Sequence, residues 1–148
     1  MKIKIYTDGA CIGNPGPGGW AAIILTENSK KEIFGGEKLT TNNRMELTAA
    51  IKALEFCIES KGKQPSFEQI KIYTDSNYLK EGITVWINTW EKNNWKTADR
   101  KNVKNVDLWK KLKELTKLLH IEWNWIKSHS TDSMNNLVDE LAKKATPI

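Results

Sequence analysis

The chain of 148 residues is most simply one domain, residues 1–148, and its net charge of +5 is only moderately basic. Its longest apolar run, residues 20–25, is far too short to cross a membrane, and its two cysteines form neither a zinc spacing nor a disulfide framework. These features exclude membrane-spanning and disulfide-stapled classes and predict a soluble, cytoplasmic protein.

The first predicted element belongs to a six-residue phrase that occurs twice. Residues 3–8 read Ile-Lys-Ile-Tyr-Thr-Asp, and residues 70–75 repeat them without change. Alternating isoleucines before Tyr and Thr are typical of a β-strand, and we expect each chain segment to leave the sheet at its aspartate. If the copies pair in parallel, Asp8 and Asp75 emerge at one carboxyl edge, where open α/β sheets place their chemistry. One isolated aspartate would more often cap a turn, but the repetition favours a shared site.

Residues 9–19 contain five glycines and two prolines, which predict a fixed turn. No Gly-Lys-Ser/Thr follows, so this is not a Walker phosphate loop. Asn14 within the turn is a candidate for ligand contact. Residues 20–26 and 31–39 then read as strands with a short connection, which favours an antiparallel meander with the first strand.

A helix is predicted from about Asn43 to a stop at Gly62, because apolar residues recur at i, i+3, i+4 and i+7. Asn43 as N-cap with Glu46 three residues later has the spacing of a capping box, which explains Glu46 without any catalytic role. The spacing leaves open whether the Glu46 carboxylate turns back to the cap or outward to the aspartate pair.

The segment after the second copy is rich in tryptophan and lysine. We expect a short helix that stops at Gly82, then a turn capped by Thr84 that carries Trp86 and Trp90. From residue 92 to 113 there are eight Lys or Arg and two Asp. Tryptophans usually anchor a core, but lysines interleaved with aromatic rings also suit a nucleic-acid backbone.

Three more elements complete the predicted domain. Asp107 is expected to cap a helix that runs to about residue 119, and residues 121–127 alternate as a strand. A polar loop with His129 follows, and a histidine in such a loop is commonly just solvated. We place Asp139 in the first turn of the closing helix, where the macrodipole favours an acid.

The acidic candidates are oxygen ligands: Asp8, Glu46, Asp75 and Asp139. A cluster of carboxylates is stable only when protons or hard divalent cations neutralise it, and the lack of a Cys/His set favours Mg²⁺ over zinc. Two such ions roughly 3.5 to 4 Å apart can activate a water and stabilise the leaving oxygen of a phosphodiester. His129 is expected to assist proton transfer or product departure.

Several motifs together resemble ribonuclease H type 1, and the match covers essentially the whole chain. The motifs are Asp8–Cys11 with Gly13–Gly16, Thr41–Leu47, Tyr73–Ser76, Trp125–His129 and Asp139–Ala142. The resemblance implies an α/β ribonuclease H-like fold with a five-stranded mixed sheet of order 3-2-1-4-5, flanked by helices. It also implies a largely monomeric endonuclease that uses two Mg²⁺ ions, with Mn²⁺ as an alternative, to cut the RNA strand of RNA/DNA hybrids. The products carry 5′-phosphate and 3′-hydroxyl ends.

The resemblance also implies roles for single residues. The four carboxylates resemble the metal ligands, and His129 resembles a histidine linked to turnover. Asn77 stands where Gln is usual, and Ser128 precedes His129 where Gly is typical; residues 130–132, 135 and 136 also depart from the pattern, which bears on loop mobility and product release. Substrate contacts are implied for Asn14, Asn42, Asn43 and Asn77 in the minor groove, for Thr41 and Asn105 at a DNA phosphate, and for Trp86 and Trp90 along the DNA strand. The basic protrusion comprises Lys92, Lys96, Arg100, Lys101 and Lys104.

Two other functions remain open at this point. A module of the same fold could bind nucleic acid without cutting it, but an absent carboxylate would favour that function, and all four are present. A DNA-cutting integrase or resolvase shares the acids, but it would not be expected to carry the asparagine-rich contacts and the basic protrusion.

Overall fold

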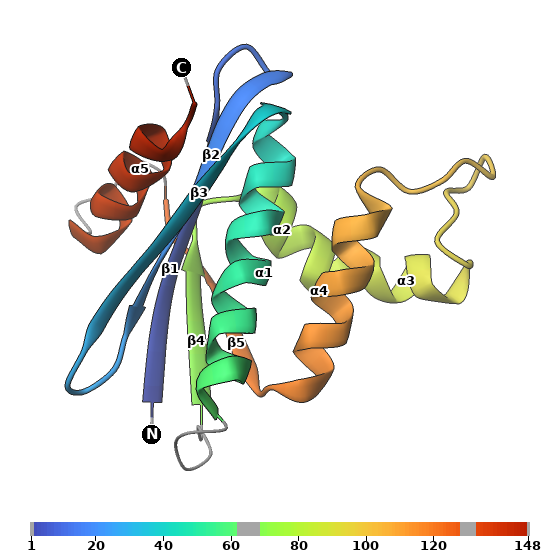
Figure 1. The fold of residues 1–148 in the computed structure, drawn as a ribbon. Helices are drawn as coiled ribbons and strands as arrows, with labels where there is room; N and C mark the ends of the chain where they lie inside the picture. The colour runs from blue at the N-terminus through green and yellow to red at the C-terminus, as the bar shows by residue number, and fades with distance from the viewer. Residues whose placement is uncertain (1, 62–68, 128–132, 148) are drawn as a thin grey trace.

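The computed structural model describes residues 2–61, 69–127 and 133–147 and contains a five-stranded sheet flanked by helices (Figure 1). The sheet order is β3-β2-β1-β4-β5, as predicted. Helices α1 and α4 cover one face of the sheet, and α5 covers the other (Figure 1). The strands are β1 (Lys2–Cys11), β2 (Gly16–Leu25), β3 (Lys30–Thr40), β4 (Gln69–Thr74) and β5 (Ile121–Trp125). The helices are α1 (Asn42–Lys61), α2 (Asn77–Glu81), the π-helix η1 (Gly82–Trp86), α3 (Ile87–Lys92), α4 (Val106–Leu118) and α5 (Ser133–Ala145).

The two copies of the repeated phrase pair in parallel and in register. Ile3 lies opposite Ile70, and the pairing continues residue by residue to Tyr6 opposite Tyr73. The rings of these two tyrosines stack with centroids 4.8 Å apart. The predicted parallel pairing is therefore confirmed, and so is the antiparallel meander of β1, β2 and β3.

The first strand differs from the prediction at Asp8. The chain does not leave the sheet there, because β1 continues to Cys11 and pairs with β2 as far as Gly18. Its ladder with β4 ends at Tyr6, so Asp8 lies on the part of β1 that extends beyond the neighbouring strand. Asp75 does follow the end of β4, as predicted.

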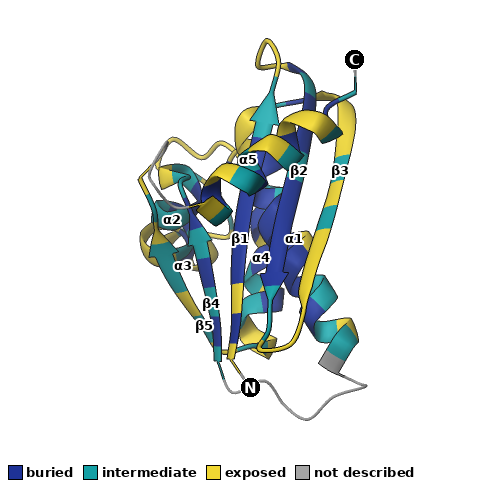
Figure 2. Cartoon of the chain, turned by 90° about the vertical axis from the view of Figure 1, so that its left-hand side faces the viewer, coloured by how far each residue is buried: buried dark blue, intermediate teal, exposed yellow. Residues whose placement is uncertain are grey.

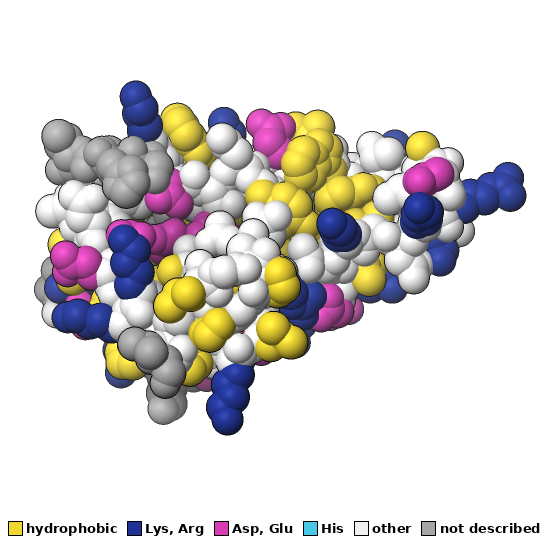
Figure 3. Space-filling view, turned by 90° about the horizontal axis from the view of Figure 1, so that it is seen from above, with side chains coloured by type: hydrophobic (Ala, Val, Ile, Leu, Met, Phe, Trp, Pro, Cys, Tyr) yellow, Lys and Arg dark blue, Asp and Glu magenta, His cyan; other side chains and the backbone are white. Residues whose placement is uncertain are grey.

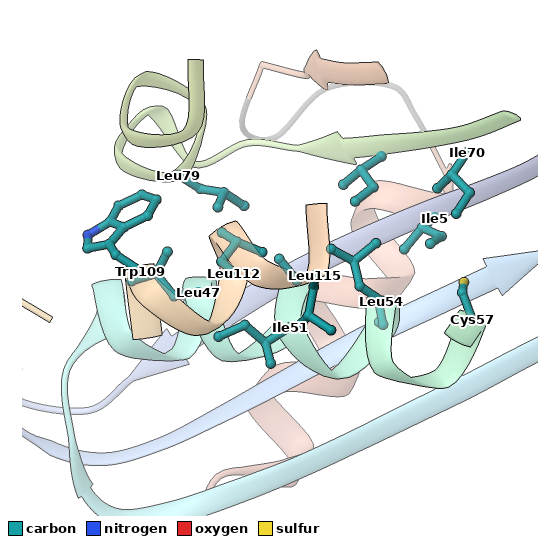
Figure 4. Packing of buried hydrophobic residues seen from close by; sticks show 14 of the residues in the cluster. Ile5, Leu47, Ile51, Leu54, Cys57, Ile70, Leu79, Trp109, Leu112 and Leu115 are labelled. Atoms are coloured by element: carbon teal, nitrogen blue, oxygen red, sulfur yellow. The ribbon is translucent and has the colours of Figure 1, made fainter. Parts of the chain in front are cut away.

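The main core lies between the sheet and the helices α1 and α4. Isoleucines of β1 and β4, such as Ile5 and Ile70, face leucines of α1 and α4, such as Leu54 and Leu112 (Figure 4). A smaller cluster on the opposite face packs Tyr6 and Ile23 against Val138 of α5. In Figure 2 the central strands are buried and β3 forms the exposed edge.

Gly82 does not stop a helix, which corrects the prediction. Its backbone is helical, and the chain passes from α2 through η1 into α3 without the predicted turn capped by Thr84. A Cβ at Gly82 would lie 2.0 Å from the ring of Trp109. The glycine therefore makes room for a buried tryptophan of α4.

Two predicted helix caps are also corrected. The N-cap of α4 is Asn105 with a left-handed backbone (φ 59°), and Asp107 lies in the first turn instead. Helix α1 begins at Asn42, and the Thr41 hydroxyl accepts a hydrogen bond from the Arg44 backbone N–H at 3.2 Å. The predicted stop at Gly62 lies outside the described residues. Among the described residues, no helix has both the length and the apolar character that a membrane crossing requires.

Candidate active site

Three carboxylates from separate segments converge beyond the end of β4. Asp8, Glu46 and Asp75 each place a carboxylate oxygen within 4.8 Å of the others. Asp8 and Glu46 are buried, and Asp75 is half-buried. The pairing of β1 with β4 aligns the two aspartates, and α1 supplies the glutamate from the side.

Gly9 allows α1 to approach β1 closely enough for Glu46 to reach Asp8. A Cβ at Gly9 would lie 2.5 Å from the backbone nitrogen of Glu46 and 2.6 Å from the carbonyl carbon of Met45. The Gly9 N–H donates a hydrogen bond of 2.5 Å to Glu46 Oε1. The Glu46 carboxylate therefore points toward the aspartates and not back to a capping box, which settles the open alternative.

The electrostatics of the cluster resist ionisation. Burial raises the pKa of Asp8, and the neighbouring charges of Glu46 and Asp75 raise it further. Burial also raises the pKa of Glu46, although hydrogen bonds from Asp8 and the Gly9 N–H oppose that shift. Without a counter-charge, the cluster retains protons that solvated carboxyls would lose.

Asp139 of α5 lines the same cavity as these three carboxylates, and its side chain contributes to the raised pKa of Asp8. The Lys143 ammonium lies 3.0 Å from Asp139 Oδ2, one helical turn further along α5. Because α5 begins at Ser133, Asp139 is not in the first turn, and the macrodipole does not account for it.

The carboxylates fit hard divalent cations. All donors are carboxylate oxygens, which such cations prefer, and they converge within the spacing that a shared ion requires. Glu46 Oε2 is buried and has no hydrogen-bond partner among the described residues. A bound cation would satisfy this oxygen and remove the electrostatic penalty of the cluster.

The acidic cluster forms the floor of an open cavity of about 510 Å³. Polar residues of α1 and α2 line its walls, including the predicted contacts Asn42, Asn43 and Asn77. Asn14 lies close by, because its Oδ1 accepts a hydrogen bond of 2.8 Å from the Asn42 backbone N–H. The cavity therefore presents amide groups beside the carboxylates.

An aromatic cluster adjoins the cavity. Trp86 and Trp90 have ring centroids 5.8 Å apart, and Trp90 lies 5.4 Å from buried Trp109. Tyr78 contacts both Trp86 and Trp109, and it also lines the acidic cavity. Trp86 is 37% exposed, so the cluster offers ring surface to solvent as well as anchoring α3.

The predicted basic protrusion extends away from the sheet between α3 and α4 (Figure 1). Its chain folds back on itself, with a bridge between Lys96 and Asn102 and a hydrogen bond of 2.8 Å from Thr97 N–H to the Lys101 carbonyl. The basic side chains on it are all exposed: Lys92, Lys96, Arg100, Lys101 and Lys104. Seen from above, several acidic groups gather at one side of the molecule with Lys and Arg beside them, and further basic groups lie at the protruding end (Figure 3).

Some expected residues lie elsewhere, and others line the site without having been predicted. His129 lies outside the described residues. Thr41 and Asn105 do not line the acidic cavity; they lie on either side of Arg44, which contacts both. Ser76, Tyr78 and Lys143 line the cavity but were not predicted. The spacing of Lys143 four residues after Asp139 is a signal that would have found one of them.

Comparison with known proteins supports these observations. The family model described as RNase H matches residues 1–146. A protein of Wolbachia sp. subsp. Drosophila simulans (strain wRi), named Ribonuclease H, is 51% identical over 144 residues, which are 97% of this chain and 94% of that protein.

Two solved structures are similar in fold. LC9-RNase H1, described as a type 1 RNase H, has a TM-score of 0.82 and 26% identity over 97% of this chain and 71% of its own. LC11-RNase H1 in complex with an RNA/DNA hybrid has a TM-score of 0.73 and 24% identity over 97% of this chain and 95% of its own. With its carboxylate cluster, its sheet order and a family match along nearly its full length, the chain belongs to the ribonuclease H family.

Proposed function

We propose that this protein is an endoribonuclease that hydrolyses the RNA strand of RNA/DNA hybrids and leaves 5′-phosphate and 3′-hydroxyl ends. The observation that carries the proposal is the convergence of Asp8, Glu46 and Asp75 within 4.8 Å in a cavity lined by asparagines. Membership of the ribonuclease H family and the hybrid bound by LC11-RNase H1 support it.

Asp8, Glu46, Asp75 and Asp139 would hold two Mg²⁺ ions, with Mn²⁺ as an alternative. Bound there, the ions would supply an activated water and stabilise the leaving oxygen of the scissile phosphodiester. The chain's own contribution is to orient these oxygens: the Gly9 N–H fixes Glu46, and the Lys143 ammonium lies against Asp139. We assign His129 to proton transfer or product departure.

Selection of a hybrid requires contacts to both strands. Four amides lie beside the carboxylates, those of Asn14, Asn42, Asn43 and Asn77. In the minor groove of a hybrid they can hydrogen-bond to the 2′-hydroxyl groups of the RNA strand, and DNA has no such groups. Trp86 and Trp90 offer ring surface to the sugars of the other strand, and Thr41 and Asn105 offer donors to its phosphate. Lysines of the basic protrusion add sequence-independent affinity.

We further propose that residues 1–148 form a single domain that acts as a monomer in the cytoplasm. Every described strand belongs to one sheet, and the helices pack on that sheet or on each other. Cys11 and Cys57 are free thiols, which suits a reducing compartment.

The test compares matched RNA/DNA, DNA/DNA and RNA/RNA duplexes with Mg²⁺, with Mn²⁺ and with a chelator. We expect metal-dependent loss of RNA from the hybrid alone, because only the hybrid offers 2′-hydroxyls on one strand and deoxyribose on the other. Binding without cleavage would indicate a binding module, and cleavage of DNA would indicate a DNA nuclease. Either outcome would overturn the proposal.

A further inference from the structure

Arg44 lies between two residues that the proposed function assigns to a DNA phosphate. Its backbone N–H donates to the Thr41 hydroxyl at 3.2 Å, and its Nη1 donates to Asn105 Oδ1 at 3.3 Å. Arg44 comes from the first turns of α1, and Asn105 immediately precedes α4, 61 residues later in the chain. One side chain therefore connects two elements that are distant in sequence.

Asp107 holds the Arg44 guanidinium in a fixed orientation. Arg44 Nη1 and Nη2 donate to the two carboxylate oxygens of Asp107 at 3.0 and 2.7 Å. A bidentate pair of this kind constrains the plane of the guanidinium, which a single contact would leave free to rotate. The Asp107 side chain is 62% exposed, so solvent screens the charge attraction of this pair. The two parallel hydrogen bonds still fix the direction in which the guanidinium faces Asn105.

The side chain of Asn105 hydrogen-bonds to neighbouring side chains and not to the helix that it precedes. Asn105 has a left-handed backbone, and its side chain makes no capping hydrogen bond to α4. Its Oδ1 accepts from Arg44, and its Nδ2 donates to the Tyr78 hydroxyl at 3.0 Å. The Trp109 indole N–H also donates to this hydroxyl, at 3.1 Å. Of the two N–H bonds of the amide, these contacts use one and leave the other for a ligand.

The chemistry of Arg44 determines which end of this amide faces it. A guanidinium only donates hydrogen bonds, so the amide must turn its oxygen toward Arg44 and its NH₂ group away. A phosphate only accepts hydrogen bonds, so it requires that same NH₂ group. With Arg44 removed, a 180° rotation of the amide would present its oxygen to the phosphate and repel it.

We propose that Arg44 is a positioning residue for substrate binding, which fixes the Asn105 amide so that its NH₂ group faces a phosphate of the bound strand. The inference rests on the proposed function, in which Asn105 and Thr41 contact that phosphate. Arg44 acts through Asn105 and does not touch the substrate itself.

The test is a double-mutant cycle with Arg44→Met and Asn105→Ala, assayed on an RNA/DNA hybrid at fixed Mg²⁺. Arg44→Met should raise KM about tenfold, the cost of one misdirected hydrogen bond, with kcat within about twofold of wild type. In the Asn105→Ala background, the same substitution should raise KM no further. Arg44→Lys should recover most of the wild-type KM, because the ammonium is also only a donor.

Two further measurements exclude other roles for Arg44. The slope of log(kcat/KM) against log salt should be the same in Arg44→Met and wild type, whereas loss of a direct phosphate contact would lower it by about 0.9. Thermal melting shows that each variant is folded at the assay temperature. Glu55→Gln is the matched control, because Glu55 pairs with Lys111 at 3.5 Å across the same two helices. It should leave KM unchanged.

Additive effects in the cycle, a reduced salt slope, or a lowered melting temperature with unchanged KM would each overturn the assignment of Arg44. Failure of the wild-type protein to cut the hybrid would instead overturn the proposed function, and this inference with it. The two failures are therefore distinguishable.

Discussion

The Asp8 carboxyl lies in an environment that disfavours its charged form, because it is buried beside Glu46 and Asp75. A carboxyl whose pKa is raised on folding binds more protons in the folded state than in the unfolded state. Its contribution to stability is therefore fully present at low pH. It declines as the pH rises above the ordinary carboxyl range toward the raised pKa.

The stability that the wild-type protein loses at Asp8 as the pH rises predicts that Asp8→Asn stabilises the metal-free protein. The amide cannot ionise, so the variant avoids the cost of keeping a proton on a buried carboxyl that the unfolded chain would release. We expect a higher melting temperature than wild type at pH 8 in the presence of a chelator. The difference should shrink at pH 5, which is closer to the ordinary carboxyl range, because the unfolded chain then releases this proton with less gain in free energy.

Adding Mg²⁺ provides the control. The ion should raise the melting temperature of the wild-type protein more than that of Asp8→Asn, because only the wild type retains the full set of anionic ligands. A variant that melts below wild type at pH 8 without metal would contradict the prediction. It would show that the Asp8 carboxylate holds the fold together.

Asp75→Asn should separate catalysis from binding. Asp75 lies at the surface of the cluster and is half-buried, so its removal leaves the asparagines and the aromatic cluster in place. We expect turnover to fall on the order of 10³-fold, while hybrid affinity, measured by fluorescence anisotropy, stays close to wild type. Equal losses of turnover and affinity would indicate a structural role.

At the residue scale, sequence spacing identified the acids but not their orientation. Glu46 is three residues from Asn43, so spacing alone also allows a capping box. The hydrogen bond that Glu46 accepts from Gly9, 37 residues away in the chain, excludes that alternative. Asp139 looked like a first-turn acid because the start of its helix was misplaced. His129 stays a prediction.

The contact between β1 and α1 depends on Gly9, because no side chain fits there. The close approach of α1 to β1 brings the Glu46 backbone against the strand that carries Asp8. The contact between β1 and α1 therefore sets the distance between the carboxylates of Asp8 and Glu46.

Gly9→Ala should destabilise the fold and weaken metal binding together. The added methyl group would force α1 away from β1, and overpacking of this kind typically costs about 1 to 3 kcal/mol. Glu46 would move with α1, so Mg²⁺ affinity, measured by calorimetry, should fall. Denaturant unfolding gives the stability change.

Gly82→Ala is the matched control. Its methyl group would also clash, with the Trp109 ring at 2.0 Å, but neither Gly82 nor Trp109 lines the acidic cavity. We expect a similar loss of stability with unchanged Mg²⁺ affinity. Equal losses of metal affinity in both variants would show that general destabilisation, and not the position of Glu46, governs the site.

At the element scale, the long strands and helices followed from their apolar periods, and their ends did not. β1 extends past Asp8 because β2 offers it a partner, a long-range contact that no local pattern contains. Glycine is typical of a helix stop, but the helical path continues through Gly82 because the missing side chain leaves room for the Trp109 ring. Tertiary packing decided both cases.

The acidic cavity and the basic protrusion lie at different places on one face of the molecule. Acidic groups gather at the cavity, and the lysines of the basic protrusion lie at the far end of the same face (Figure 3). Lys101 and Lys104 also line a second hollow of about 410 Å³ together with Tyr78 and Trp90. A bound polyanion would therefore contact the protrusion and the aromatic cluster at a distance from the carboxylates.

Lys101→Gln with Lys104→Gln should weaken hybrid binding in a salt-dependent way. Each lysine that neutralises a phosphate contributes about 0.9 to the slope of log affinity against log salt, so the slope should become shallower. The rate of cleavage at saturating hybrid should stay near wild type. Binding titrations at several salt concentrations provide the measurement.

Lys30→Gln with Lys31→Gln removes the same charge at the start of β3, outside the acidic cavity. This control should leave the slope unchanged. If both double variants flatten it equally, the net charge of the protein, and not the protrusion, determines affinity.

At the scale of the molecule, the sheet order could be predicted because the motifs resemble a known family. The parallel pairing could be predicted because a six-residue phrase occurs twice. The hydrogen-bond network of Arg44, Asn105 and Asp107 could not be predicted from the sequence. It joins residues 61 and 63 positions apart through side-chain geometry alone, and neither spacing nor composition carries that information.

The alternation of isoleucines in β1 and β4 has one more consequence. A slip of β4 by two residues along β1 would keep the same faces inward, but it would leave only one of the two isoleucine pairs and would separate the stacked rings of Tyr6 and Tyr73. The same slip would carry Asp75 roughly 7 Å away from Asp8, too far for them to share an ion. One strand register therefore governs both the packing of the core and the spacing of the carboxylates, so an error in it would cost stability and chemistry together.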